Sequence, residues 1–214
     1  MNFSSSFFFF INSFSEKTLS AIKPEVVLIS GDLTDAKTAN KYGSYQYTEE
    51  WEAYSAIVDK IQYPVVDLRG NHDAFDVLTY EKSSYQEFTK DRAFKQNREI
   101  TLSKDFGNYT IVGINAAPEP GMRRPYNFIG YISEEQRINL QEIGERTKTS
   151  NHSIWFGHYP TPSKLNSHSS KAHSRYLFSS SSIVLLPRFH RRLCNCLSLR
   201  AFARFCSSNA EAPF

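Results

Sequence analysis

The fold of this 214-residue chain is decided by the stretch Pro24-Glu-Val-Val-Leu-Ile-Ser-Gly-Asp-Leu-Thr-Asp35. Its apolar run, residues 26–29, has the length and continuity of a strand that is buried on both faces of a sheet. Asp32 follows at the carboxyl end of that run, which is where ligands bind in open α/β sheets. The stretch therefore predicts a buried strand that delivers a carboxylate to a binding site.

A helix and a second strand follow this stretch. Apolar residues recur at helical spacing from Thr48 to Gln62, with Thr48 as the expected N-cap, and Pro64 ends the pattern. The next strand begins at Val65 and leads into the motif Gly70-Asn71-His72-Asp73. A strand, a crossover helix and a strand predict a parallel pair in an α/β sheet.

The remaining elements are expected between residues 84 and 156. They are a helix over 84–93, a strand over 109–114, a helix from 133 to about 148, and a strand over 153–156 that leads into Gly157-His158. The third of these opens with Ser133 and Gln136, which are spaced as a capping box. The three motifs thus follow three predicted strands, and their side chains could converge at one edge of a sheet.

Composition divides the chain into three parts. The formal net charge is +3, yet residues 164–214 hold eight Lys and Arg side chains against a single acid, Glu211. All three cysteines also lie in that segment, so the main body has no disulfide framework. We expect a disordered leader over 1–23, a domain over 24–163, and a disordered, basic, Ser- and Arg-rich tail over 164–214.

Bulk properties exclude several classes of protein. A hydrophobic content of 40% with 22% charged residues is ordinary for a globular domain. No apolar run approaches the roughly 18–20 residues of a membrane span. The basic tail lacks regular aromatic interleaving, so we expect no nucleic-acid partner.

The motif residues are suited to metal chemistry. A carboxylate such as Asp32 can bridge two divalent cations, and the side chains of Asn71 and His158 can complete a metal's shell without adding charge. His72 stands beside one of these ligands and is chemically suited to proton transfer. Together the motifs predict most of a two-metal site.

Three motifs, in this order, resemble those of the calcineurin-like metallophosphoesterases: Gly31-Asp-Leu-Thr-Asp35, Gly70-Asn-His-Asp73 and Gly157-His158. The resemblance implies an α/β fold, a four-layer α/β/β/α sandwich, and a centre of two ions drawn from Zn, Fe, Mn or Mg. It implies that Asp32, Asn71 and His158 are metal ligands. It further implies that His72 is the general acid and that Asp35 orients His72.

Two motifs of that family do not occur in this sequence. The family opens with Asp-x-His and closes with Gly-His-x-His, whereas the first aspartate here is Asp32 and no glycine follows Gly157. We therefore expect a partial sandwich without its C-terminal strands, an incomplete centre with at most one ion, and impaired activity. We interpret His168 and His173 as exposed polar residues of the tail.

Three interpretations of function remain open. The first is a metal-dependent phosphoester hydrolase, whose partner is a phosphoester substrate selected by the loop 118–130. The second is a non-catalytic fragment or interaction protein that retains part of the fold. The third is a frameshift or a misplaced exon boundary at the ends of the coding sequence. The family members that the chain resembles most are membrane proteins, and localisation is left without a prediction.

Overall fold

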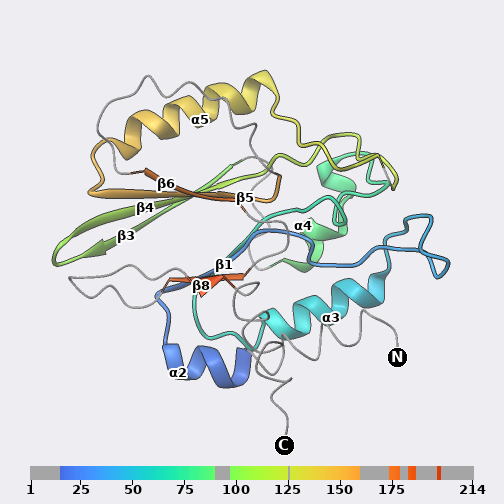
Figure 1. The fold of residues 1–214 in the computed structure, drawn as a ribbon, viewed down its shortest axis with the longest axis horizontal. Helices are drawn as coiled ribbons and strands as arrows, with labels where there is room; N and C mark the ends of the chain where they lie inside the picture. Colours follow the sequence, from blue (N-terminus) through green and yellow to red (C-terminus); the bar gives the residue numbers. More distant parts are fainter. Residues whose placement is uncertain are drawn as a thin grey trace, which may run out of the picture.

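The structure is a computed structural model that describes residues 15–89, 97–124 and 126–159, and the backbone of three short strands beyond residue 173 (Figure 1). Most of the expected leader and of the expected tail lies outside the described residues. The boundaries at 24 and 163 therefore stay predictions. The expectation that C-terminal strands are missing also stays a prediction, because the structure describes only these three short strands beyond residue 173.

The first sheet is built on the apolar run that follows Pro24. Strand β1, Val26–Ile29, pairs in parallel with β2, Val65–Asp67, and helix α3, Thr48–Val58, connects the two. The predicted parallel pair with its crossover helix is confirmed. The sheet has the order β2-β1-β7-β8, in which β7, Ile183–Leu186, and β8, Leu197–Ser198, are antiparallel to their neighbours.

The second sheet has the order β3-β4-β5-β6. Its strands are β3, Arg98–Lys104, β4, Gly107–Ile114, β5, His152–Gly157, and β6, Ser174–Phe178. β3 and β4 form an antiparallel hairpin, and the other neighbours are parallel. Helix α5, Glu134–Thr147, connects β4 to β5 and starts with the predicted capping box of Ser133 and Gln136.

The elements stack in four layers (Figure 1). Helix α5 covers the outer face of the second sheet, and the first sheet lies against the inner face. Helix α3 and the short α2, Ser20–Ile22, lie beyond the first sheet. The order of layers is α/β/β/α, which confirms the predicted α/β sandwich.

Strand β1 supplies both cores of the domain because its side chains alternate between two faces. Val26 and Leu28 pack with Ile111 and Phe156 of the second sheet, which forms the core between the sheets. Val27 and Ile29 instead pack toward α3. All four residues of β1 are buried, as expected for a strand covered on both faces.

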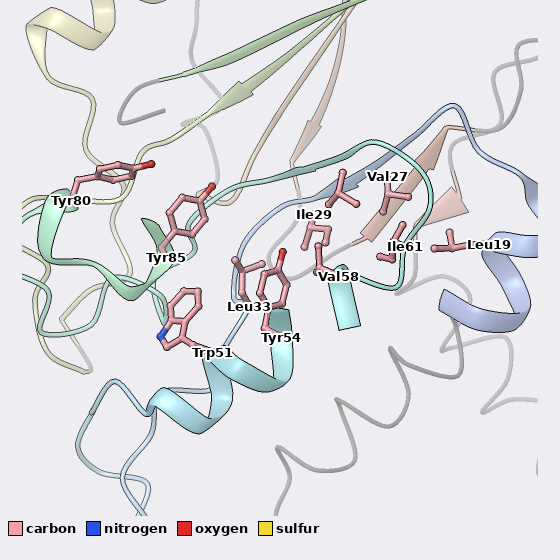
Figure 2. Close-up of a cluster of buried hydrophobic side chains, with 11 residues drawn as sticks. Leu19, Val27, Ile29, Leu33, Trp51, Tyr54, Val58, Ile61, Tyr80 and Tyr85 are labelled. Carbon is pink, nitrogen blue, oxygen red and sulfur yellow. The ribbon is translucent and has the colours of Figure 1, made fainter. Parts of the chain in front are cut away.

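The helix-side core is rich in aromatic side chains (Figure 2). Trp51 and Tyr54 of α3 face the sheet with their rings edge to face, and Tyr85 meets Trp51 in the same way. The indole nitrogen of Trp51 donates to Gln46 at 3.1 Å, so the buried ring keeps its polar atom satisfied. This packing fixes α3 and the loop that precedes it.

The ends of α3 differ from the sequence prediction. Thr48 is the first helical residue, and the N-cap is Tyr47, whose side chain makes no capping bond. The helix stops at Val58 rather than Gln62, because the backbone amides of Lys60 and Ile61 form tight i→i−3 bonds that end its regular pattern.

Three short helical turns complete the described chain. They are a π-helical turn, Ser15–Leu19, a 3₁₀ turn, Tyr80–Lys82, and α4, Ser84–Phe88. The helix predicted over 84–93 ends at Phe88, because Thr89 adopts an extended conformation (φ −86°, ψ 154°) and caps it; residues 90–96 lie outside the described part. Within the described residues, no helix has the length and apolar character needed to span a membrane.

Candidate metal centre

Three loops that follow strand ends form the candidate centre. β1 leads into the loop of Asp32, β2 into the loop of Asn71 and His72, and β5 into His158. β1 and β2 are neighbours in one sheet, whereas β5 belongs to the other. The sequence suggested that the motifs meet at the edge of one sheet. They meet instead from two sheets, because the core between the sheets holds these strand ends together.

His158 lies at the centre of this arrangement. Its Nε2 atom lies 2.8 Å from Oδ1 of Asn71 and 3.4 Å from Oδ1 of Asp32. Its Nδ1 atom lies 2.9 Å from the backbone oxygen of Ser30. The structure thus brings together the three side chains that the sequence nominated as metal ligands.

The Ser30 contact orients the His158 ring. Nδ1 carries a proton and donates it to the Ser30 carbonyl, so in a neutral ring the Nε2 lone pair faces Asn71 and Asp32. A metal-bound histidine commonly donates its second ring N–H to a backbone carbonyl in this way. A divalent cation placed between these atoms would be held by the Nε2 lone pair and by the oxygens of Asn71 and Asp32.

The donor set fits one divalent ion. Metal–ligand bonds of about 2.0–2.2 Å place neighbouring ligand atoms about 3 Å apart, which is the spacing seen around His158. Among the described residues, no group of three or more His, Cys, Asp and Glu side chains is placed to hold a metal. Beside the carboxylate of Asp32 and the imidazole of His158, the remaining candidate donor is the amide oxygen of Asn71.

Two glycines allow the loops to approach this closely. A Cβ atom on Gly70 would lie 2.3 Å from Oδ1 of Asp32 and 2.9 Å from Cε1 of His158. A Cβ atom on Gly31 would lie 2.5 Å from the backbone nitrogen of Gly70. Asp32 itself adopts a positive φ of 55°, a conformation that aspartate tolerates better than most residues. The motif glycines are required by the contact between the loops.

Asp73 joins two of the loops, a role that the sequence analysis did not assign. Its Oδ1 accepts from the backbone nitrogens of Leu33 and Thr34 at 2.9 and 3.0 Å, and its Oδ2 accepts from that of Gly70 at 2.7 Å. Burial and the nearby charge of Asp32 raise the pKa of Asp73 to about 6, although these amide bonds oppose the change. The fourth residue of a Gly-Asn-His-Asp motif was the signal available in the sequence.

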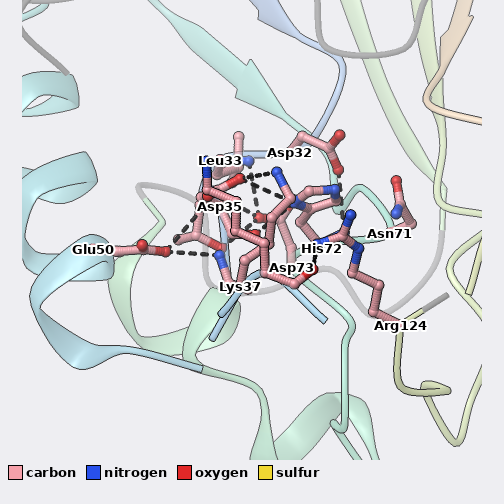
Figure 3. A network of polar contacts seen from close by, with 12 residues as sticks. Asp32, Leu33, Asp35, Lys37, Glu50, Asn71, His72, Asp73 and Arg124 are labelled. Atoms are coloured by element: carbon pink, nitrogen blue, oxygen red, sulfur yellow. Dashed lines mark hydrogen bonds and ion pairs between the residues drawn. The ribbon is translucent and has the colours of Figure 1, made fainter. Parts of the chain in front are cut away.

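His72 stands beside the centre and contacts the first loop (Figure 3). Its Nδ1 lies 2.6 Å from the backbone oxygen of Asp35 and 3.7 Å from the carboxylate oxygen of the same residue. Lys37 bonds that carboxylate. Asp35 thus reaches His72 mainly through its backbone, while its side chain is shared with a lysine.

Helix α3 holds the loop of Asp35 in place. Oε2 of Glu50, in the first turn of α3, accepts from the backbone nitrogens of Asp35 and Ala36 at 3.0 and 2.9 Å. Ala36 has a positive φ of 45°, so the chain turns sharply at this point. The crossover helix therefore supports the loop chemically as well as by packing.

Comparison with known proteins identifies the family. Residues 8–190 match the family model described as calcineurin-like phosphoesterase, which covers more than half of the chain. The chain belongs to the calcineurin-like phosphoesterase family. The sequence-based assignment to this family is confirmed.

Two curated proteins are similar to this calcineurin-like phosphoesterase chain. Transmembrane protein 62 of Mus musculus is 38% identical over 160 residues, which cover 71% of this chain and 24% of that protein. An Arabidopsis thaliana protein named putative metallophosphoesterase is 30% identical over 194 residues, which cover 81% of this chain and 26% of that protein. The chain spans about a quarter of the length of these relatives.

A further loop of this calcineurin-like phosphoesterase chain, residues 121–132, contacts the centre. Nδ2 of the buried Asn127 donates to the backbone oxygen of Asn71 at 3.2 Å. The backbone nitrogen of Arg124 donates to Oγ of Ser44 at 3.1 Å, and Ser44 donates to Asp76 at 2.6 Å. Ser44 thus joins this loop to both of the first two motif loops. No local pattern in the sequence signalled these contacts.

Proposed function

We propose that the chain is a metal-dependent phosphoester hydrolase domain whose centre, in this chain, holds one divalent ion. The observation that carries the proposal is the convergence of Asp32, Asn71 and His158 from three loops and two sheets. Membership of the calcineurin-like phosphoesterase family supports a phosphoester as the substrate class.

Asp32, Asn71 and His158 would hold the ion, with Zn, Fe, Mn and Mg as the candidates. This ligand set contains one carboxylate oxygen, one amide oxygen and one imidazole nitrogen. Its composition is intermediate between zinc sites, which are rich in nitrogen ligands, and magnesium sites, which use oxygen ligands. When bound, such an ion polarises a phosphoryl oxygen and lowers the pKa of a bound water. The protein contributes a ligand set whose orientation is fixed by Ser30 and by the Asp73 bonds.

His72 is proposed as the general acid that protonates the leaving oxygen. Since its Nδ1 is held at the Asp35 carbonyl, its Nε2 is the nitrogen that carries the transferred proton. The nearest carboxylate oxygen of Asp35 lies 3.7 Å from the same Nδ1, and Lys37 pairs with that carboxylate.

Basic side chains and the loop 118–130 are proposed to bind the substrate. Figure 3 shows the side chain of Arg124 extending from that loop toward the motif side chains. An anionic phosphate is attracted by such a cation, and the planar guanidinium can donate two parallel hydrogen bonds to it. The loop is joined to the centre through Asn127, so changes in it can reach the reacting group.

The centre is proposed to be incomplete in this chain. Neither Asp-x-His nor Gly-His-x-His occurs in the sequence, so ligands that the family uses for a second ion have no counterpart among its motifs. A mechanism that clamps both the nucleophile and the leaving group needs two ions. We expect at most one bound ion and slow hydrolysis.

Elemental analysis of the purified chain tests this proposal. After incubation with Mn²⁺ and desalting, we expect about one ion per chain in the wild type and none in a His158→Ala variant. His152→Ala, at an exposed histidine of β5, serves as the matched control and should keep the ion. Hydrolysis of p-nitrophenyl phosphate should be slow in the wild type and in His152→Ala and absent in His158→Ala. Two tightly bound ions with rapid hydrolysis would overturn the incomplete centre, and no bound ion would overturn the metal site.

The second candidate is a non-catalytic protein that retains part of the fold. The absence of the two family motifs from the sequence favours it. It predicts no metal-dependent hydrolysis at any Mn²⁺ concentration, even with the ion bound. Translation of the flanking nucleic acid in all reading frames separates both candidates from a frameshift, because a frameshift predicts Asp-x-His upstream and Gly-His-x-His downstream in another frame.

A further inference from the structure

Large apolar side chains are exposed mainly on two loops. The described residues include ten exposed large apolar side chains, and only Leu78 and Ile138 lie outside residues 42–45 and 122–132. The other eight are Tyr42, Tyr45, Met122, Tyr126, Phe128, Ile129, Tyr131 and Ile132. Such clustering differs from the scattered exposure that is normal for a folded protein, and it marks an interaction surface.

The two loops form one surface. The backbone nitrogen of Arg124 donates to Ser44, and its guanidinium donates to the backbone oxygen of Lys41. These contacts join the segment of Tyr42 and Tyr45 to the segment that carries the other six side chains. We call this surface the aromatic face.

The aromatic face adjoins the candidate metal centre. Tyr126 and Phe128 flank Asn127, whose side chain bonds the backbone of Asn71. Tyr45 follows Ser44, which bonds Asp76 in the loop of His72. The residues that hold the centre and the residues that are exposed therefore alternate along the same turns.

The charges on this face are positive. Lys41 and Arg123 are exposed among the apolar side chains. Of the acids in adjoining segments, Glu119 pairs with the buried Arg69 at 3.0 Å, Asp76 accepts from Ser44 and Glu134 pairs with Arg137 at 2.6 Å; Glu135 is exposed in the first turn of α5. Aromatic side chains with neighbouring Lys and Arg match the composition of protein surfaces that contact anionic lipid headgroups.

The side chains also project from the loops instead of lying flat. Tyr42 is 85% exposed, Phe128 65% and Ile129 64%. Projecting side chains fit a fluid interface, which adapts to them, better than a rigid protein partner, which would need a matching pocket for each. We propose that the aromatic face docks on the surface of an anionic lipid bilayer, with Phe128 and Ile129 inserted and Lys41 and Arg123 at the headgroups.

Docking would place the candidate centre beside phosphate-bearing headgroups. The docking proposal does not depend on hydrolysis, because it rests on exposure and charge alone. Its test therefore uses binding as the readout, and failure of the hydrolase proposal leaves the result interpretable.

Co-sedimentation of the full chain with vesicles tests the proposal. We expect binding to vesicles of phosphatidylcholine with about 30% phosphatidylserine, little binding to phosphatidylcholine alone, and weaker binding in high salt. The double variant Phe128→Ser/Ile129→Ser should lose at least tenfold in affinity. Arg123→Gln should lose about fivefold, which is the effect typical of one basic side chain near an anionic surface.

Ile138→Ser is the matched control because Ile138 is an exposed apolar residue of α5, outside the aromatic face. It should bind as the wild type does. A Phe128→Trp variant gives a second readout that does not depend on removing apolar surface. Its fluorescence should shift to the blue with anionic vesicles and be quenched by brominated lipids.

Two results would overturn the proposal. One is a lack of binding to anionic vesicles by a wild-type chain that is folded by circular dichroism. The other is self-association in solution that the double variant abolishes while vesicle binding is unchanged, which would assign the face to contact between copies of the chain.

Discussion

Oδ1 of Asp73 lies 3.0 Å from the backbone nitrogen of Thr34, and this bond joins the second motif loop to the first. Asp73 is fully buried, whereas Asp32 and Asn71, which belong to the same two motifs, are partly accessible. The motifs thus contain residues of two kinds. Some are candidate ligands at the centre, and others hold the motif loops together.

Asp73→Asn should destabilise the fold. The amide keeps one acceptor for Leu33 and Thr34, but its NH₂ group then faces the backbone N–H of Gly70, and two donors cannot bond each other. We expect a loss of about 2 kcal/mol in the free energy of unfolding, measured by urea titration. Asp76→Asn, at an exposed position of the same loop, should change it by less than about 0.5 kcal/mol. Equal effects of the two substitutions would contradict the role assigned to Asp73.

Gly70→Ala should abolish metal binding. The added Cβ would lie 2.2 Å from the backbone nitrogen of Asp32 and 2.3 Å from its Oδ1, so the ligand must move. We expect calorimetric titration with Mn²⁺ to show binding in the wild type and none in the variant. Retention of wild-type affinity would show that the loops can separate without losing the ligand set.

Gly144→Ala is the control for a glycine that no close contact requires. Gly144 lies within α5, and a Cβ there would meet no atom within 4 Å. Alanine is the better helix former, so this substitution should stabilise the protein by about 0.5–1 kcal/mol and leave the Mn²⁺ titration unchanged. Both substitutions replace glycine with alanine, yet only Gly70→Ala should abolish Mn²⁺ binding.

Local patterns were sufficient to predict much of the fold. The apolar run of β1, the amphipathic spacing of α3 and the capping box of α5 are set by residues a few positions apart, and all three elements were predicted from the sequence. Strand β3 was missed. Its Ile100 and Leu102 alternate with polar residues, as in a half-buried strand, but its stability depends on pairing with β4.

The candidate site was predicted less completely than the fold. Motif order and family resemblance nominated Asp32, Asn71 and His158, and the structure brings them together. Their approach from two different sheets could not be inferred from strand order, because it depends on how the sheets pack. The contacts of Asn127 and Ser44 join segments separated by tens of residues, and no local signal marks them.

Asn127→Asp should be more harmful than Asn127→Ala. Nδ2 of Asn127 donates to the backbone oxygen of Asn71, and a carboxylate oxygen in its place would repel that carbonyl inside a buried turn. Alanine only removes the bond, which costs about 1–3 kcal/mol for the buried carbonyl left without a partner. Thermal unfolding should give the order wild type, Asn127→Ala, Asn127→Asp from the highest to the lowest Tm. The reverse order of the two variants would show that Asn127 does not act as a donor.

Asp67 is buried at the end of β2. Tyr54 donates to its Oδ2 at 2.7 Å and Tyr85 to its Oδ1 at 3.0 Å. Desolvation raises the pKa of Asp67, while the Tyr54 bond and the charge of Arg98 lower it by less. The folded state therefore holds the proton more tightly than the unfolded state. This contribution to stability is fully present below the unfolded pKa and is lost as the pH rises through the folded value.

Asp67→Asn removes the ionisation and should reduce the loss of stability as the pH rises above the ordinary aspartate range. Tyr54→Phe should act in the opposite direction, because it removes a bond that lowers the pKa of Asp67 and so extends the loss to higher pH. Urea titrations between about pH 4 and pH 7 measure both slopes. The same dependence on pH in the wild type and in both variants would mean that Asp67 ionises alike in the folded and unfolded chain, and that its burial is offset by Arg98 and the two tyrosines.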